Sequence, residues 1–239
     1  MRREKGNTQG HTLWRSECAG KKEMGQKEVN MRKEEQLDRI RQHSASVIGM
    51  DQARKSAVCI PLIDTEDGFD VLFEIRSSKI ESQPGDICFP GGMVEPGETE
   101  QEAAVREMTE ELLVDISQIQ VIGSVDIFAG SRLYVYPYVV LLENYKKTFS
   151  TDEVEEVFRV PLQFFLENDP EVYYTHMKVI PEENFPFDRI YGGREYVWRD
   201  RREEIFFYQY KQYNIWGMTA KIIEVLARLI KNSGDDNKM

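Results

Sequence analysis

The segment from Gly92 to Val114 places the strongest constraint on how this 239-residue chain folds. Thr99 and Glu102 have the spacing of a capping box, in which a side-chain hydroxyl and a glutamate satisfy the free N–H groups at a helix start. From Thr99 to Leu113 the sequence has no glycine or proline and is rich in alanine, glutamate, methionine and leucine, which favours a helix. We therefore predict a glycine-containing loop that leads into a helix.

The predicted helix separates apolar residues from acidic ones. At about 100° per residue, one sector holds four apolar residues, Ala104, Val105, Met108 and Leu112. The adjacent sector holds three carboxylates, Glu107, Glu110 and Glu111. Three glutamates on a helix are usually a solvated face, but here they repel one another and lie near the negative end of the helix dipole. A bound cation would remove both penalties, so the pattern favours a metal-capable face.

The complete spacing resembles the Nudix box, the 23-residue motif of the Nudix hydrolases. The matching positions are Gly92, Glu98, Arg106, Glu107, Met108, Glu110, Glu111 and Val114. Where the family usually has a glycine this chain has Leu113, for which we expect a different exit from the helix, with one extra helical residue. The order of strands and helices suggests a mixed sheet between helical layers. The resemblance implies an α/β fold, the Nudix-type α/β/α sandwich with a mixed β-sheet between helices.

A second set of residues resembles the coenzyme A pyrophosphatases within that family. The set comprises Leu72-Phe73-Glu74-Ile75-Arg76-Ser77, Gly85, Phe89-Pro90-Gly91-Gly92 and Ile215 to Ala220 at the head of the expected last helix. The two resemblances together cover roughly residues 56 to 230. One position departs, because Glu81 stands where the subgroup has an arginine. If that arginine holds an anionic substrate, the reversed charge favours another nucleoside diphosphate derivative.

The resemblance implies a hydrolase that depends on Mg²⁺ or Mn²⁺ and acts on the diphosphate linkage of a small nucleoside diphosphate derivative. Hard cations select oxygen ligands, and a bound cation can neutralise phosphate oxygens and activate a water. The implied metal ligands are Glu107, Glu111, Glu110 and the carbonyl of Gly91 or Gly92. The implied catalytic set is Glu107, Glu110, Arg106 and Glu98.

Two members of this set have narrower expected roles. Arg106 is expected to orient a box glutamate, and the alternative is a surface pair with Glu110 or Glu102. Glu98 is expected to anchor the loop or to bind a metal through water.

Further residues outside the box are candidates for the base and for substrate contacts. The acidic stretch before Val160 contains four possible bases, Asp152, Glu153, Glu155 and Glu156, with a solvated loop as the alternative. We select Glu153 and Glu156 among them. Arg76 and Lys79 are expected to contact phosphates. A 3′-phosphate could contact Arg194, Arg199, Arg201 or Arg202, and an adenine could stack on Phe185, Phe187, Tyr191 or Trp198; for these aromatic residues the alternative is packing.

These residues leave three kinds of function to compare. The first is hydrolysis of coenzyme A or acyl-CoA to 3′,5′-ADP and (acyl-)4′-phosphopantetheine, with ADP-ribose or a dinucleotide as the alternative substrate. The second is a non-catalytic Nudix-fold module that binds a nucleotide, against which the intact charges of the box argue. The third is an acidic-helix interaction protein, which leaves the Gly91-Gly92 loop unexplained.

The composition limits the partners and the cellular compartment that we expect for the protein. The net charge of −11 argues against nonspecific binding to nucleic acid. We expect no membrane span, because the sequence has no run of 18 apolar residues. Three cysteines without a CxxC spacing indicate a reducing compartment, and we expect a cytoplasmic location. The family resemblance implies a possible homodimer.

The expected organisation is an arm, one domain and a tail. Residues 1–30 are predicted to be a flexible or disordered arm, residues 31–232 a single Nudix domain and residues 233–239 a flexible tail. Helices are expected over 31–50, 99–113, 161–167 and 218–230. Strands are expected over 56–63, 69–75, 87–89, 119–128, 133–142, 154–160, 172–180 and 204–210, with a long irregular stretch over 181–202.

Overall fold

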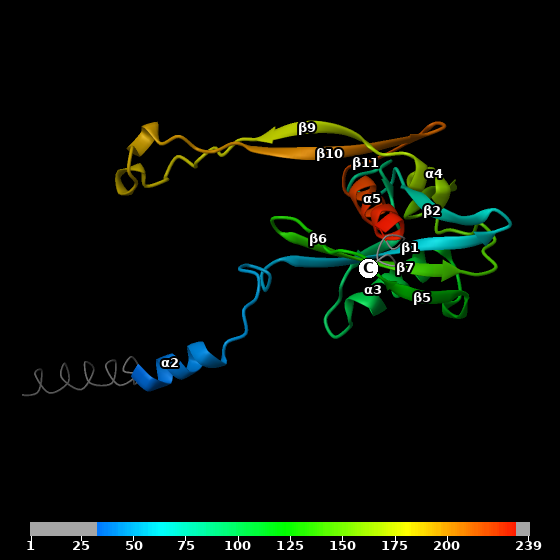
Figure 1. The fold of residues 1–239 in the computed structure, drawn as a ribbon, viewed down its shortest axis with the longest axis horizontal. Coiled ribbons are helices and arrows are strands. Elements are labelled where there is room, and N and C mark those ends of the chain that lie inside the picture. The colour runs from blue at the N-terminus through cyan, green and yellow to red at the C-terminus, as the bar shows by residue number, and fades with distance from the viewer. Residues whose placement is uncertain (1–32, 233–239) are drawn as a thin grey trace, which may run out of the picture. The chain divides into compact units, whose positions relative to one another are not determined.

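The computed structural model describes residues 33–232 (Figure 1). The predicted arm over 1–30 and tail over 233–239 lie outside these residues, and the proposed extent of the domain stays a prediction. The chain divides after Met50 into two compact units. In the first unit a helix, α2, runs over Lys33–Gln42. The prediction of a helix as far as residue 50 is wrong, because serines, β-branched residues and Gly49 follow Gln42 and have low helix propensity.

The second unit is built on a mixed sheet. Within residues 51–232 this sheet contains eight strands: β1 (Arg54–Thr65), β2 (Gly68–Arg76), β3 (Ile87–Cys88), β4 (Gly91–Met93), β5 (Ile119–Ser124), β6 (Phe128–Ala129), β7 (Leu133–Leu142) and β8 (Val154–Pro161). Strand β1 is parallel to β7 and antiparallel to β2 and β4. The predicted hairpin is confirmed, since β1 and β2 pair from Leu62↔Val71 to Thr65↔Gly68.

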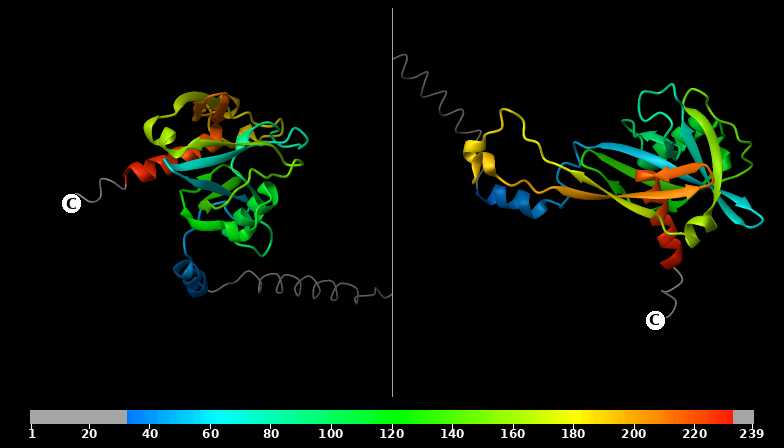
Figure 2. Two further views of the ribbon diagram at one scale, coloured as in Figure 1. Left: turned by 90° about the vertical axis from the view of Figure 1, so that its right-hand side faces the viewer. Right: turned by 90° about the horizontal axis from the view of Figure 1, so that it is seen from above.

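Helices cover both faces of this sheet. They are α3 (Glu100–Leu112), α4 (Leu162–Glu167) and α5 (Gly217–Asn232). Successive residues of a strand point to opposite faces, and Ala57 and Cys59 of β1 accordingly pack in the cluster with α3, whereas Val58 and Ile60 pack with α5. Figures 1 and 2 show α3 and α5 on opposite sides of the sheet. The predicted α/β/α arrangement with a mixed sheet is confirmed.

A second, antiparallel sheet lies on the α5 side. It consists of β9 (Glu171–Met177), β10 (Arg201–Tyr210) and β11 (Tyr213–Trp216). Tyr208 and Ile215 pack into the same core cluster as α5. The placement of Ile215 and Trp216 at the head of the last helix is wrong, because both belong to β11 and the helix begins at Gly217.

Short 3₁₀ turns complete the connections. They are η1 (Ile116–Gln118), η2 (Phe187–Arg189) and η3 (Gly193–Glu195). The last two lie in the expected irregular stretch between β9 and β10. No helix within residues 33–232 is long and apolar enough to cross a membrane.

Candidate active site

Helix α3 starts and packs as its sequence predicts. The Thr99 hydroxyl accepts from the backbone N–H of Glu102 at 3.2 Å, and the Glu102 carboxylate accepts from the N–H of Thr99 at 2.8 Å. Ala104, Met108 and Leu112 have no exposed surface and pack on the sheet. The box glutamates therefore lie along the side of the helix, beside the loop that contains Gly91 and Gly92.

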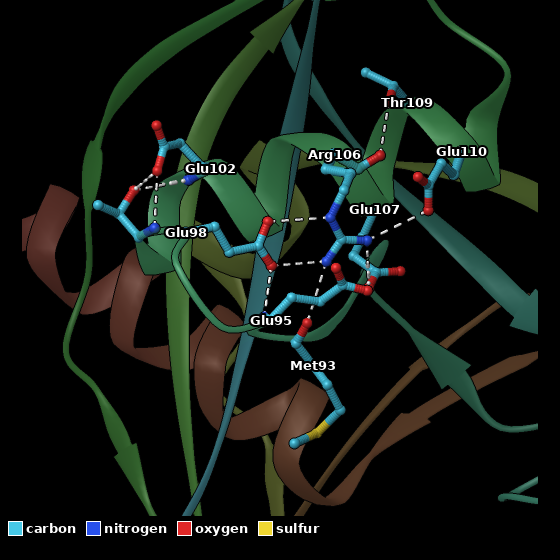
Figure 3. Close-up of polar contacts among 9 residues, drawn as sticks. Met93, Glu95, Glu98, Glu102, Arg106, Glu107, Thr109 and Glu110 are labelled. Carbon is cyan, nitrogen blue, oxygen red and sulfur yellow. Dashed lines mark hydrogen bonds and ion pairs between the residues drawn. The ribbon is translucent and has the colours of Figure 1, made fainter.

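Arg106 connects the box glutamates (Figure 3). Its Nε and Nη2 donate to Glu98 at 3.1 and 2.8 Å, and its Nη1 donates to Glu107 at 2.9 Å and to Glu110 at 3.4 Å. Nη2 also donates to the carbonyl of Met93 at 3.2 Å. The guanidinium lowers the pKa of Glu98, mainly by donating hydrogen bonds to its carboxylate. Arg106 thus holds three glutamates and the loop in one network.

Glu111 has a different environment from the glutamates that contact Arg106. Only 3% of its surface is exposed, and its Oε2 accepts from the backbone N–H of Gly91 at 2.7 Å. Burial and, to a lesser extent, the nearby negative charge of Glu74 together raise the pKa of Glu111 to about 9. Burial also raises the pKa of Glu107, against the effect of Arg106. Burying negative charge without a paired cation is costly, so this corner favours either protonated carboxyls or a bound cation.

The glycine pair is required by close approach. Gly91 has φ +156°, and an added Cβ would collide with the carbonyl of Ala57 and the backbone of Val58. A Cβ on Gly92 would collide with the carboxylate of Glu107. Neither position can hold a side chain. At Gly91 a side chain would prevent β4 from pairing with β1, and at Gly92 it would displace the carboxylate of Glu107.

The hydrogen-bond pattern of β4 distinguishes the two glycine carbonyls. Cys59 N–H donates to the carbonyl of Pro90, and Val94 N–H donates to the carbonyl of Lys55, so alternate residues of this segment bond to β1. By this alternation Gly92 faces β1, whereas the N–H and carbonyl of Gly91 face away from it. The donation of the Gly91 N–H to Glu111 agrees with this orientation.

Glu74 in β2 also belongs to this corner, although the sequence reasoning gave it no role. It is 1% exposed, and its Oε1 accepts from the thiol of Cys88 at 3.3 Å. Burial raises the pKa of Glu74 to about 7, and the charges of Glu153 and Glu107 act in the same direction. The signal in the sequence was a glutamate between Phe73 and Ile75, where an all-apolar strand is expected.

The loop before β8 brings Glu153 to the cluster, but not Glu156. The negative charge of Glu153 raises the pKa of Glu74, Glu107 and Glu111. Glu156 instead accepts from the hydroxyl of Tyr213 at 2.6 Å. Of the two selected base candidates, only Glu153 is thus placed by its charge next to the buried carboxylates.

The NUDIX domain model matches residues 53–182. The chain belongs to the Nudix family. It is accordingly a pyrophosphohydrolase that acts on a phosphoanhydride. The Nudix domain contains all the carboxylates of the corner described above.

Three relatives illustrate this membership. The mouse peroxisomal coenzyme A diphosphatase NUDT7 is 32% identical over 188 residues, which are 74% of this chain and 71% of that protein. The Caenorhabditis elegans peroxisomal coenzyme A diphosphatase ndx-8 is 33% identical over 139 residues, 56% of each chain. The uncharacterized Nudix hydrolase NudL of Photorhabdus laumondii is 30% identical over 184 residues, 76% of this chain and 87% of that one.

The end of the Nudix helix differs from our expectation. Leu113 is the C-cap and has φ 52° and ψ 48°, the left-handed conformation that a glycine adopts there. The expectation of an extra helical residue is wrong. The carbonyls of Glu111 and Leu112 accept from the N–H of Ser150 and the hydroxyl of Thr148, each at 2.7 Å. These bonds fix the helix end where the Nudix pattern places it, although Leu113 is not a glycine.

The two expected phosphate contacts are engaged with neighbouring loops. Arg76 Nε donates to the carbonyl of Ser82 at 3.1 Å, and its charge lowers the pKa of Glu74. Lys79 Nζ donates to the carbonyl of Thr151 at 3.0 Å and lies 3.7 Å from Asp152. Arg76 is therefore near the acidic corner, and Lys79 bridges two loops at its edge.

The residues expected to contact a 3′-phosphate or an adenine lie in the segment between β9 and β10 or at the start of β10. Arg194 lies over the ring of Phe187 at 4.8 Å, and Arg202 lies over the ring of Tyr174 at 3.5 Å. Phe185 packs edge-on against Trp198, with ring centroids 5.6 Å apart. Phe185 and Trp198 are thus in contact, whereas Tyr191 is 98% exposed, and the substrate contacts of this segment stay a prediction.

The donor set of the Nudix corner fits a divalent cation. Within residues 33–232 no three His, Cys, Asp or Glu side chains form a preformed metal cluster. However, among the described residues the Oε2 atom of Glu74 is buried without a hydrogen-bond partner. The charge of Glu107 also raises the pKa values of Glu74 and Glu111, and the charge of Glu74 raises that of Glu111. Oxygen donors with excess negative charge are the environment that Mg²⁺ and Mn²⁺ require.

Proposed function

We propose that this Nudix protein is a diphosphatase that requires Mg²⁺ or Mn²⁺ and cleaves coenzyme A or acyl-CoA. The products would be 3′,5′-ADP and 4′-phosphopantetheine or its acyl derivative. The observation that carries the proposal is the buried carboxyl group of Glu111, which accepts from the Gly91 N–H and has no ion-pair partner among the described residues. The choice of coenzyme A is supported by the names of the mouse and nematode relatives and by the motif around Arg76 and Phe89.

In this proposal Glu107 and Glu111 hold the cation, and Glu110 contributes from the exposed rim. The Gly91 carbonyl is preferred to that of Gly92, because Gly92 faces β1 in the sheet. When bound, the cation would neutralise phosphate oxygens and lower the pKa of a water.

The remaining box residues position these groups. Arg106 keeps Glu98 and Glu107 in place by donating to both of them. Glu98 anchors the loop as well, because its Oε1 accepts from the N–H of Glu95 at 2.7 Å. Glu153 is the proposed base, since its charge acts on Glu74, Glu107 and Glu111 and it lies on an exposed loop that water can reach. Glu156 is a weaker candidate, because it is bound to Tyr213.

Glu81 keeps a second substrate class in consideration. This exposed glutamate lies in the loop between β2 and β3, where the coenzyme A subgroup has an arginine. A negative charge at this point disfavours a polyanionic substrate such as coenzyme A. It therefore favours ADP-ribose or a dinucleotide, which lack the additional 3′-phosphate. Arg76 and Lys79 would contact the diphosphate in either case.

A comparison of substrates tests the proposal. Coenzyme A, 3′-dephospho-CoA, ADP-ribose and a diadenosine polyphosphate would each be incubated with the full chain and Mg²⁺ or Mn²⁺, and the products separated by chromatography. We expect the highest kcat/KM with coenzyme A and release of 3′,5′-ADP. A preference for ADP-ribose would replace the substrate assignment. No turnover of any compound would instead favour the non-catalytic nucleotide-binding module.

The cellular compartment and the oligomeric state of the enzyme are part of the same proposal. Cys59 and Cys88 are free thiols, in accordance with a reducing compartment, and we propose the cytoplasm for this chain. Association as a homodimer is proposed from the family resemblance alone. Light scattering coupled to gel filtration, over a range of protein concentrations, measures the mass in solution and tests it.

A further inference from the structure

Glu74 is placed where a carboxylate is costly. It lies in the middle of β2 and is 1% exposed, and its neighbours Leu72 and Phe73 are almost fully buried. A buried ionisable group is normally paired with an opposite charge or fully hydrogen-bonded. The contacts of Glu74 are therefore informative about what this strand position is for.

The contacts within the described residues do not satisfy this carboxylate. Oε1 accepts only from the Cys88 thiol at 3.3 Å, and a thiol is a weak donor. Oε2 is buried and has no hydrogen-bond partner among residues 33–232. The nearby Arg76 forms no ion pair with Glu74, and its Nε donates to the carbonyl of Ser82 instead. One oxygen of Glu74 is thus left available to a group outside the chain.

The free oxygen is on the side of the sheet that faces the Nudix helix. Leu72 packs in the α3 cluster, and Glu74 is two residues further along β2, so its side chain points to the same face. The residue opposite Glu74 in the neighbouring strand is Cys88, and the chain reaches Gly91 three residues later. Gly91 in turn donates to Glu111. Glu74 therefore approaches the acidic corner from the sheet, opposite the helix that supplies Glu111.

We propose that Glu74 is a further carboxylate of the cation site and supplies an oxygen ligand from the sheet, directly or through a water on the cation. Mg²⁺ and Mn²⁺ prefer oxygen ligands, and Mg²⁺ keeps several waters, so a protein oxygen from outside the box can replace one of these waters or bind through it. The inference rests on the proposed function only in that Glu107 and Glu111 hold a divalent cation. It does not depend on which nucleoside diphosphate is hydrolysed.

Mn²⁺ binding to the full chain tests this role without any substrate. Glu74→Gln removes the charge and keeps the size of the side chain. Glu66→Gln makes the same change on an exposed residue of the turn between β1 and β2. Free Mn²⁺ would be measured by electron paramagnetic resonance during titration of metal-free protein. We expect Glu74→Gln to weaken binding roughly 10- to 100-fold and Glu66→Gln to match the unmodified chain.

Thermal unfolding of the same samples adds a readout that a merely structural role of Glu74 would not produce. Without metal, Glu74→Gln should melt no lower than the unmodified chain, because a repelled buried charge is removed. With Mn²⁺, its stabilisation should be smaller than that of the unmodified chain, because the stabilisation by a ligand grows with the logarithm of its concentration over its Kd. A variant that melts lower in both conditions, with unchanged Mn²⁺ affinity, would overturn the proposal.

Two further controls keep the result decisive. If Glu74→Gln fails to fold, Glu74→Thr supplies a second neutral residue that suits a strand, and wild-type Mn²⁺ affinity in either folded variant overturns the proposal. The double variant Glu74→Gln with Glu111→Gln should weaken binding by a factor different from the product of the single effects, since both act at one site. Weakened Mn²⁺ binding in a chain that hydrolyses none of the four compounds would support the ligand and overturn the proposed reaction.

Discussion

Two groups of carboxylates lie side by side at the candidate active site, and they are balanced in different ways. Glu98, Glu107 and Glu110 share the guanidinium of Arg106. Glu74 and Glu111 are buried and form no ion pair with any described residue. The first group shares one positive charge of the chain, whereas the second has no cationic side chain of the described residues paired with it. We therefore propose that a cation binds beside the second group and that Glu107 contributes to it from the first, while Arg106 and Glu98 hold these side chains in place.

The largest effect is expected from changing the second group. Glu111→Gln keeps an acceptor for the Gly91 N–H but removes the charge that would hold the cation. We expect kcat to fall by roughly 10³-fold, which corresponds to about 4 kcal/mol of transition-state stabilisation. Steady-state hydrolysis measures this loss, and circular dichroism checks that the fold is retained.

The control for this change is Glu66→Gln, which should keep full activity. Unchanged turnover in Glu111→Gln would show that the buried carboxylate is not a metal ligand. The distinction between the two groups would then lose its functional meaning.

A smaller effect is expected from the first group. Arg106→Lys keeps the positive charge but loses the planar fork that donates to Glu98 and Glu107 together. We expect kcat to fall by roughly 10- to 100-fold and the free energy of unfolding to fall by about 1–2 kcal/mol. Kinetics and urea unfolding measure the two effects.

Arg228→Lys is the matched control for Arg106→Lys. Arg228 forms a 4.0 Å pair with Glu224 in α5, away from the acidic corner, and its replacement should change the free energy of unfolding by less than about 0.5 kcal/mol. Equal losses in the two variants would contradict a special role for the fork of Arg106.

The smallest effect concerns the helix end next to Glu111, where no charge is altered. Leu113 is 58% exposed and adopts the left-handed conformation, which is costly for a residue with a side chain. Leu113→Gly should raise the free energy of unfolding by about 0.5 kcal/mol and leave hydrolysis unchanged. A loss of activity would mean that the position of Glu111 depends on this cap as much as on the local charges. Urea unfolding and steady-state kinetics give both numbers.

The sequence predicts best what is decided within a few residues. The capping box of α3, its apolar stripe and the β1–β2 hairpin all depend on local spacing, and the structure contains each of them. The contact of Arg106 with Glu110 likewise follows from helical periodicity. These features could be predicted because their partners lie within one or two turns of chain.

Features decided by distant partners were not predictable in the same way. Glu74 lies in the corner because β2 pairs with β3 and β8. These pairings cannot be deduced from the residues next to Glu74, which resemble an ordinary buried strand. The difference between Glu153 and Glu156 depends on Tyr213, which lies 57 residues beyond Glu156. Strand β11 was missed for a different reason, because it pairs with β10 across a tight turn at Lys211, where φ is 52°, and the turn has no glycine or proline to mark it.

The loop between β7 and β8 is joined to the last turn of α3 by a backbone N–H at Ser150 and a hydroxyl at Thr148. It reaches the proposed base, Glu153, three residues after Ser150. The connection between the helix and the loop therefore depends on two hydrogen bonds, one from a backbone N–H and one from a hydroxyl. A loop of another length could replace this one if it supplies one N–H and one hydroxyl to the same two helix carbonyls. Evolution could change the base or the substrate in this way while the box itself stays constant.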